Sequence, residues 1–278
     1  MMLQIRRIVA VVVLLLARTV QASAQSVSHL PQSFLSSVSG LWTVAVGVNV
    51  VGQPAFDGGK GDSLGVSPIL TIGRAGGSAE RFRSPRDSSS IALFDDEGLS
   101  AGLAGKLKSG RTASSHAELN GLGDVDRTLE AGGFVQYFPV DWFRLRAEVR
   151  QGFGGHHGVV ADFAADAVVP VWQRLTLSGG PRFTWESTKA TAPYFGIDAA
   201  QALASGLPAF DAKGGAHSVG AGTQLRYQIN PQWEAHAYVE YQRLLGDAAA
   251  SPLVTQRGSP NQTSFGLGAS YAFDVRVP

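Results

Sequence analysis

The sequence predicts an all-β fold: a transmembrane antiparallel β-barrel of about 12 strands, with about 10 as the alternative. Segments of about ten residues alternate between apolar and polar side chains, short and long connections alternate between them, and glycine is abundant. The chain has 34 glycines in 278 residues, no cysteine and a net charge of +1. Lack of cysteine excludes disulfides and thiolate metal sites, and near-neutral charge argues against nucleic acid as a partner.

Residues 1–24 have the pattern of a secretory signal peptide. Arg6 and Arg7 precede the apolar run Ile8–Ala17, and Ala22-Ser23-Ala24 matches a small-x-small cleavage site. The run is too short for a membrane-spanning helix, which needs about 20 residues. We therefore expect export with cleavage after Ala24, which leaves 25–278 as the barrel domain.

Alternation with a period of two defines the strands in order along the mature chain. It begins in 42–50 and is clearest in 143–151, where an apolar face (Phe143, Leu145, Ala147, Val149) opposes a charged one (Arg144, Arg146, Glu148, Arg150). The other predicted segments are 64–74, 98–109, 126–138, 158–169, 173–186, 217–229, 233–245 and 263–273. Their lengths suit tilted membrane strands of about 9–11 residues better than sandwich strands of about 5–6. Most of six strand glycines fall on the inward face, where they relieve crowding: Gly102, Gly132, Gly220, Gly222, Gly266 and Gly268.

The connections assign the two ends of the barrel. Short ones are Pro139–Asp141, Val169–Val171 and Asn230–Gln232, and long ones are 110–125, Gly154–Gly158, 187–216 and 246–262. Bacterial barrels have short periplasmic turns and longer external loops. Placing 110–125 outside requires one more crossing within 79–95, split near Pro85–Ser89, and this gives the count of twelve. Only Asp198–Gly206 has a helical pattern, with Asp198 as N-cap.

Aromatic residues mark the predicted rims and the last strand. Trp42, Trp142, Trp172 and Trp233 lie next to the short-turn rim, and Trp185 lies at the outer end of its strand. Indole rings favour membrane interfaces, so this placement indicates two aromatic girdles. The final strand has apolar groups at alternate positions up to Phe273, and we expect Asp274–Pro278 to extend beyond it into the periplasm.

No group of residues in the sequence has a convincing catalytic pattern. His156-His157 beside Asp162 is the best candidate, but two histidines in a Gly-Gly-His-His-Gly turn are more simply polar loop residues. Asp95-Asp96-Glu97 has carboxylates of the kind that bind Ca²⁺, yet a solvated acidic turn is the simpler interpretation. We predict no catalytic residue, no metal site and no cofactor.

The charged face of 143–151 has two interpretations. Arg144, Arg146, Glu148 and Arg150 could tune ion passage, because rings of charge set pore selectivity. They could instead form a self-neutralising plug by pairing with Glu130, Glu234 and Glu240 on other inward faces. We favour the plug, because a barrel of this size is narrower than the porins of 16–18 strands that leave a wide channel.

Several longer segments resemble the MipA/OmpV family of outer-membrane proteins, also called MltA-interacting proteins. The most specific are Tyr194–Phe210 and Arg243–Val254, and supporting ones are Leu119–Asp126, Gly154–Gly158, Phe183–Trp185 and Pro54–Gly59. The resemblance implies a non-enzymatic barrel in the outer membrane of a Gram-negative bacterium. It also implies a scaffold between a lytic murein transglycosylase and a bifunctional murein synthase.

Two functional hypotheses therefore stand. One is a structural scaffold that presents its periplasmic side to murein enzymes, with outer-membrane lipid as its surroundings. The other is a narrow channel, or a surface adhesin or receptor that uses the lumen arginines and the long external loops. Short turns offer little area against the roughly 800 Å² per partner of a stable interface, which is a physical objection to the scaffold. A weak contact or the N-terminal 25–40 segment would meet this objection.

Overall fold

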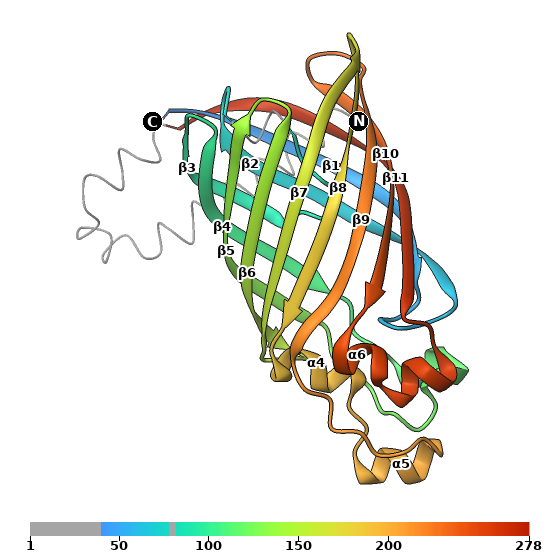
Figure 1. Ribbon diagram of the computed structural model, residues 1–278. Helices are drawn as coiled ribbons and strands as arrows, with labels where there is room; N and C mark the ends of the chain where they lie inside the picture. The colour runs from blue at the N-terminus through green and yellow to red at the C-terminus, as the bar shows by residue number, and fades with distance from the viewer. Residues whose placement is uncertain (1–39, 78–81, 278) are drawn as a thin grey trace, which may run out of the picture. The chain divides into compact units, whose positions relative to one another are not determined.

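The computed structural model describes residues 40–77 and 82–277, and these form a closed β-barrel (Figure 1). The predicted signal peptide lies outside the described residues. The strands are β1 (Gly40–Pro54), β2 (Asp62–Arg74), β3 (Ser89–Asp96), β4 (Leu99–Lys108), β5 (Thr128–Val140), β6 (Phe143–Gly154), β7 (Val159–Trp172), β8 (Leu175–Glu186), β9 (Gly215–Gln228), β10 (Trp233–Leu244) and β11 (Asn261–Val277). Across the described ranges, no helix has the length and apolar character needed to cross a membrane.

The barrel wall has a polar inner face and an apolar outer face. On β6, Arg144, Arg146 and Arg150 are buried, whereas Leu145 and Val149 are exposed. Successive strand residues point to opposite sides, so the arginines enter the lumen and the aliphatic side chains point outward. Outward apolar residues are also exposed on the other strands, together with four of the tryptophans: Trp142, Trp172, Trp185 and Trp233. The predicted alternation is confirmed.

The connections separate the two ends of the barrel as expected. Tight turns join β3 to β4, β5 to β6, β7 to β8 and β9 to β10, and we call this the short-turn end. Segments 55–61, 109–127, 155–158, 187–214 and 245–260 lie at the opposite, long-loop end, where the helices gather in Figure 1. One assignment was wrong: Val169–Val171 belong to β7, which continues to Trp172.

The prediction of 12 antiparallel strands is also wrong, because the described barrel has 11 strands and one parallel pair. β2 and β3 run in the same direction and pair only through Thr71 with Ser90 and Ile72 with Ile91. The connection between them therefore has to return toward the long-loop end. Residues 82–88, here called the luminal segment, make this return inside the barrel, where they contact inward side chains of β6, β7, β8 and β10.

The composition of the luminal segment explains why it is not a wall strand. Its alternate positions are either Arg83, Pro85 and Asp87 or Phe82, Ser84, Arg86 and Ser88. Either set would place a charged group against lipid, which is costly, and proline cannot donate to the strand ladder. Inside the lumen the same charges meet partners of opposite sign. The additional crossing inferred from the loop pattern exists in part, but it runs through the lumen.

The end of the chain also departs from the prediction. We expected Asp274–Pro278 to lie beyond the barrel, but β11 continues to Val277. Its last four described residues pair with the first four of β1, from Thr43 with Asp274 to Gly40 with Val277. The Thr43 hydroxyl also donates to Asp274 Oδ1 over 2.7 Å. These residues therefore help to close the barrel.

Several inward-facing positions require glycine because atoms of the neighbouring strand lie where a Cβ would be. A Cβ built at Gly102, Gly132 or Gly220 would collide with the carbonyl oxygen of a neighbouring strand. At Gly268 it would collide with the side chains of Asn49 and His236, which meet in the lumen. The expectation that these glycines relieve crowding is confirmed at these positions.

Candidate functional site

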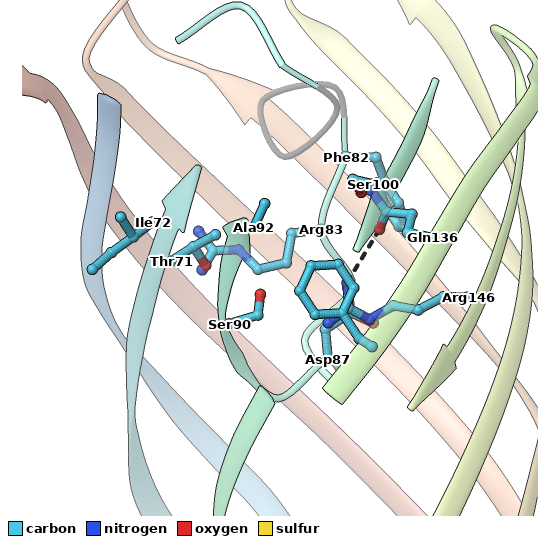
Figure 2. A pocket seen from close by; sticks show the side chains of 11 residues that line it. Thr71, Ile72, Phe82, Arg83, Asp87, Ser90, Ala92, Ser100, Gln136 and Arg146 are labelled. Carbon is cyan, nitrogen blue, oxygen red and sulfur yellow. Dashed lines mark hydrogen bonds and ion pairs between the residues drawn. The ribbon is translucent and has the colours of Figure 1, made fainter. Parts of the chain in front are cut away.

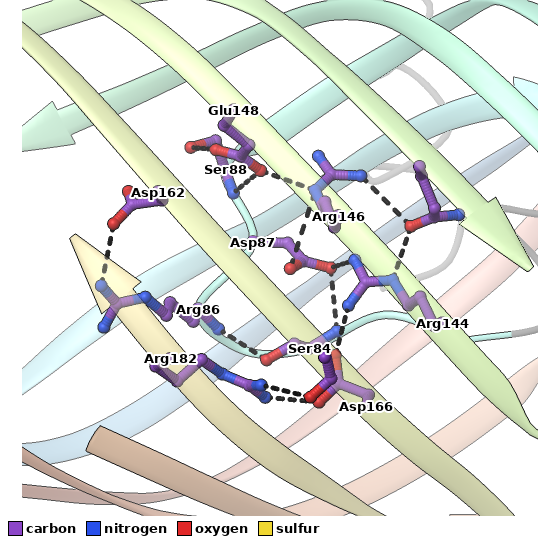
Figure 3. A network of polar contacts seen from close by, with 12 residues as sticks. Ser84, Arg86, Asp87, Ser88, Arg144, Arg146, Glu148, Asp162, Asp166 and Arg182 are labelled. Atoms are coloured by element: carbon purple, nitrogen blue, oxygen red, sulfur yellow. Dashed lines mark hydrogen bonds and ion pairs between the residues drawn. The ribbon is translucent and has the colours of Figure 1, made fainter. Parts of the chain in front are cut away.

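The lumen is crossed by a continuous network of charged side chains, centred on Arg144 of β6 (Figure 3). Both Arg144 and its partner Asp166 of β7 are 0% exposed, and Arg144 Nη1 lies 2.9 Å from Asp166 Oδ2. Arg144 Nε donates to Gln136 Oε1 over 2.7 Å, and Arg182 of β8 approaches Asp166 Oδ1 at 2.5 Å. Each of these charges is buried with a partner of opposite sign, which avoids the large penalty of an unpaired buried charge.

The luminal segment is bound into this network at three consecutive positions (Figure 3). Arg86 Nη2 lies 2.8 Å from Asp162 Oδ1 of β7, and its Nη1 lies 2.7 Å from Glu240 Oε1 of β10. Asp87 Oδ2 accepts from Arg144 Nη2 over 2.5 Å. Ser88 donates its hydroxyl to Glu148 Oε2, also over 2.5 Å. The segment is thus fixed to strands on different sides of the barrel.

The β6 arginines form ion pairs inside the lumen as predicted, but only some of their partners are the predicted ones. Arg150 Nε lies 2.9 Å from Glu130 Oε2, as expected, and Arg146 Nε lies 2.7 Å from Glu148 Oε1 on the same strand. Glu240 pairs with Arg86 instead, and Glu234 lies 3.6 Å from Arg226. The sequence analysis missed three partners of the β6 arginines: Asp87, Asp162 and Asp166. Asp162 and Asp166 are spaced four apart on one face of β7, and this spacing could have revealed them.

Little free space remains around the luminal segment. Two cavities adjoin it, with volumes of about 20 and 10 Å³. Each is comparable to the room needed for about one water molecule. Aromatic rings add to the filling, because Arg144 lies over the Phe82 ring and Arg146 over the Phe134 ring at 5.0 and 4.1 Å. The luminal segment and its partners on β6, β7, β8 and β10 therefore occupy the middle of the lumen.

The long loops form an ordered cap at the long-loop end. It contains α4 (Thr188–Phe195), α5 (Ala199–Ser205), α6 (Gly246–Ala250) and the short helical turns 113–115, 117–119 and 253–257. One apolar cluster joins Tyr194, Phe195, Ala212, Leu244, Ala248 and Val254, and a second joins Leu119, Leu122, Ile197, Leu207 and Leu253. The predicted helix is confirmed as α5, with Asp198 as N-cap and Gly206 in the left-handed conformation that ends it.

Hydrogen bonds tie the loops of the cap to one another. Arg111 Nη1 donates to Tyr194 O over 2.6 Å, and Gln201 Nε2 donates to Leu122 O over 2.6 Å. Arg257 Nη1 donates to Glu118 O over 3.0 Å. These bonds connect the 109–127, 187–214 and 245–260 loops, so the cap is one interlocked unit rather than a set of independent loops.

A charged cluster lies where the cap meets the barrel. Lys108 Nζ is 2.9 Å from Asp57 Oδ2 and 3.6 Å from Glu186 Oε1, and it lies 4.1 Å from the centre of the Tyr194 ring. The ammonium of Lys108 lowers the pKa of Asp57 from 3.8 to about 2. His217 Nδ1 lies 3.3 Å from Glu186 Oε2, which adds β9 to the junction as a third strand beside β4 and β8.

The histidine pair and the run of carboxylates that the sequence analysis considered as possible catalytic or metal sites lie in turns and at a strand end. His156 is buried and lies 3.2 Å from Glu130 Oε1, whereas His157 is exposed. Asp95 and Asp96 end β3, and Glu97 occupies the tight turn that follows. Among the residues that the structure describes, no group of three or more histidine or carboxylate side chains is arranged to hold a metal ion.

The sequence of the chain was compared with protein families and with curated proteins. A family model described as MltA-interacting protein MipA matches residues 46–273. No curated protein sequence matches the chain.

Solved structures of outer-membrane proteins match the chain at low similarity. A NanC porin is 10% identical, with 83% of this chain and 98% of that chain covered and a TM-score of 0.38. The KdgM porin in complex with disordered oligogalacturonate is 10% identical, with 84% and 99% covered and a TM-score of 0.36. OprG from Pseudomonas aeruginosa is 12% identical, with 84% and 96% covered and a TM-score of 0.27. At these scores we draw no functional inference from the three structures.

Proposed function

Because the chain belongs to the MltA-interacting protein MipA family, we propose that it is a non-enzymatic outer-membrane barrel that acts as a scaffold for murein enzymes. Its partners in this proposal are a lytic murein transglycosylase and a bifunctional murein synthase. The barrel anchors them at the outer membrane of a Gram-negative bacterium. The observation that carries the choice of scaffold over channel is the filled lumen, in which Arg86, Asp87 and Ser88 are bound to the wall.

The outer face supports membrane insertion. Aliphatic side chains are exposed along the wall, among them Leu64, Leu103 and Leu267, and tryptophans lie near both ends of the strands. An apolar band between aromatic girdles is the pattern that lipid selects for in outer-membrane barrels. We place the cap outside the cell and the short turns in the periplasm, and we propose that the chain is exported with residues 1–24 removed.

The scaffold contact has to lie on the periplasmic side, where little of the barrel is available. The turn between β5 and β6 contains only Asp141 and Trp142, and the turn between β3 and β4 only Glu97 and Gly98. A stable interface needs roughly 800 Å² from each partner. We therefore propose that residues 25–39 supply most of the contact and that the short turns add to it.

Pull-down and conductance measurements test this proposal together. Tagged barrel is solubilised from envelopes, and co-purifying transglycosylase and synthase are measured by immunoblot, beside a variant that lacks residues 25–39. We expect the full protein to retain the transglycosylase and the shortened variant to lose it, while both keep the same heat-modifiable migration. The same preparations are inserted into planar bilayers, where we expect no steady conductance.

The channel and receptor hypotheses predict a different result. Clear single-channel steps without bound transglycosylase would refute the scaffold and favour a channel in which the luminal segment moves aside. Binding of an external ligand that depends on the cap, again without murein enzymes, would favour a receptor. Retention of the transglycosylase after removal of 25–39 would leave the scaffold and move its contact to the short turns.

A further inference from the structure

The larger of the two luminal cavities has an unusual polar lining (Figure 2). It lies between the luminal segment and the wall, and its volume of about 20 Å³ admits one small species. The polar or charged residues that line it are Thr71, Arg83, Asp87, Ser90, Ser100, Gln136 and Arg146. The luminal segment contributes Arg83 and Asp87, and the other five come from β2, β3, β4, β5 and β6.

Two buried polar groups at this cavity, a guanidinium nitrogen and a hydroxyl, are unsatisfied. Arg146 Nη2 and Thr71 Oγ1 are both inaccessible and have no hydrogen-bond partner. The Arg146 side chain is only 5% exposed, so bulk water does not satisfy it. A guanidinium has donors only, and leaving a buried charged donor without an acceptor is costly. A bound species that accepts hydrogen bonds would therefore remove this cost.

Two of the acceptors at the cavity are already engaged. Asp87 Oδ2 accepts from Arg144 Nη2 over 2.5 Å and from the Ser84 amide over 3.0 Å. Gln136 Oε1 accepts from Arg144 Nε over 2.7 Å and from Arg146 Nη1 over 3.3 Å. The other carboxylate oxygen, Asp87 Oδ1, lies 3.7 Å from Arg146 Nε.

A second guanidinium adds positive charge. Arg83 lines the cavity and forms no direct ion pair or hydrogen bond with another described residue; Asp87 and Glu234 act on it over a longer distance. Arg146 is paired with Glu148 at 2.7 Å and lies 3.7 Å from Asp87, so the guanidinium at the cavity without a direct ion pair to a described residue is that of Arg83. A guanidinium without a direct partner in the described ranges, beside a second guanidinium with an unsatisfied nitrogen, favours an anion in the space that they line.

We propose that this cavity binds one small monovalent anion, chloride under cellular conditions, held by Arg83, Arg146 and the hydroxyl of Thr71. A water molecule fits the volume but carries no charge to balance the guanidinium of Arg83, which lines the cavity without a direct ion pair to any residue that the structure describes. An anion accepts from Arg83, Arg146 and the Thr71 hydroxyl, and a volume of about 20 Å³ suits a halide-sized ion. The bound ion links the luminal segment to β2 and β6 and so helps to hold that segment in the lumen.

Halide exchange tests the site on the purified full barrel in detergent. Unfolding temperature is measured at constant ionic strength in sodium chloride, sodium bromide and sodium gluconate, whose anion is too large to enter. We expect chloride and bromide to raise the unfolding temperature by about 2–4 °C over gluconate. We expect this difference to vanish in Arg83→Gln and to shrink in Thr71→Val. The control Arg226→Gln removes a luminal charge that does not line the cavity, and it should keep the full halide effect.

Crystals grown in bromide provide a readout that does not depend on any variant folding. We expect one anomalous peak in the cavity of the unmodified protein, between Arg83 and Arg146. Absence of that peak, with only water in the cavity, would overturn the proposal. So would an equal halide effect in the unmodified protein and in a folded Arg83→Gln variant, because the stabilisation would then come from another part of the surface.

Discussion

Replacing Arg86 by glutamine tests whether ion pairs fix the luminal segment. The guanidinium joins two carboxylates on different strands, at 2.8 Å from Asp162 and 2.7 Å from Glu240. Nη2 also donates to the hydroxyl of Thr184 over 2.5 Å. Glutamine keeps most of the side-chain volume but removes the charge and the forked donor geometry.

The expected loss of stability depends on which ion pairs Asp162 and Glu240 keep when Arg86 is replaced. Removing one member of a buried ion pair costs about 3–5 kcal/mol when the other charge is left alone. Here Asp162 keeps Arg150 at 2.6 Å, and Glu240 keeps Arg182 only at 3.7 Å. The side chains of Arg86, Asp162 and Glu240 also keep 11–15% exposure, which lets water reach them in part. We therefore expect Arg86→Gln to lower the free energy of unfolding by about 2–4 kcal/mol.

The assay is denaturant unfolding in detergent micelles, followed by tryptophan fluorescence, with bilayer conductance as a second readout. Lys213→Gln is the matched control, because it breaks the ion pair with Asp211 in which both side chains are highly exposed. Such a pair contributes at most about 1 kcal/mol. We expect Arg86→Gln to be clearly less stable than the control and to pass brief currents. Equal stability of the two variants, with no current from either, would refute the claim that the network holds the segment.

Three further predictions concern other parts of the barrel. Gly132→Ala should lower the free energy of unfolding by about 1–3 kcal/mol in the same denaturant assay, because its Cβ would collide with Val149 O; unchanged stability would mean that the strands adjust freely. Since Lys108 lowers the pKa of Asp57 from 3.8 to about 2, that pair stabilises the fold above pH 3.8 and loses its effect as the pH falls toward 2. Asp57→Asn should therefore show a smaller acid-induced loss of stability over this range, and a loss identical to that of the unmodified protein would contradict the assignment. Deletion of Asp274–Pro278 should reduce the heat-modifiable band in outer membranes, because it removes four residue pairs with β1; an undiminished band would show that closure does not need them.

The strands were predictable because each is determined by its own residues. In 143–151 every second residue is apolar and every intervening one is charged, so both the strand and its inward face follow from the period alone. The same holds for α5, whose N-cap Asp198 and terminal Gly206 are local signals. These features need no knowledge of the rest of the chain.

The luminal segment could not be assigned in this way. The order of short and long connections correctly required another crossing between Arg74 and Leu99, but a crossing inside the barrel satisfies that requirement as well as one in the wall. The two are distinguished by whether Arg86 and Asp87 find partners, and those partners come from β6, β7 and β10. Such long-range pairing leaves no periodic signal. The end of β11 was misjudged for a similar reason, because its partners are the first residues of β1.

The cap gives a physical reason for the places where the family resemblance is strongest. Tyr194–Phe210 supplies residues to both apolar clusters, and Arg243–Val254 contributes Leu244, Ala248 and Val254 to one and Leu253 to the other. Wall strands need only alternation, so many sequences serve equally well there. An interlocked cap needs particular side chains at particular positions, because a change in one loop leaves cavities or unpaired polar groups in the next. The ion pairs that cross the lumen and the interlocked cap therefore support the scaffold that we propose over the channel.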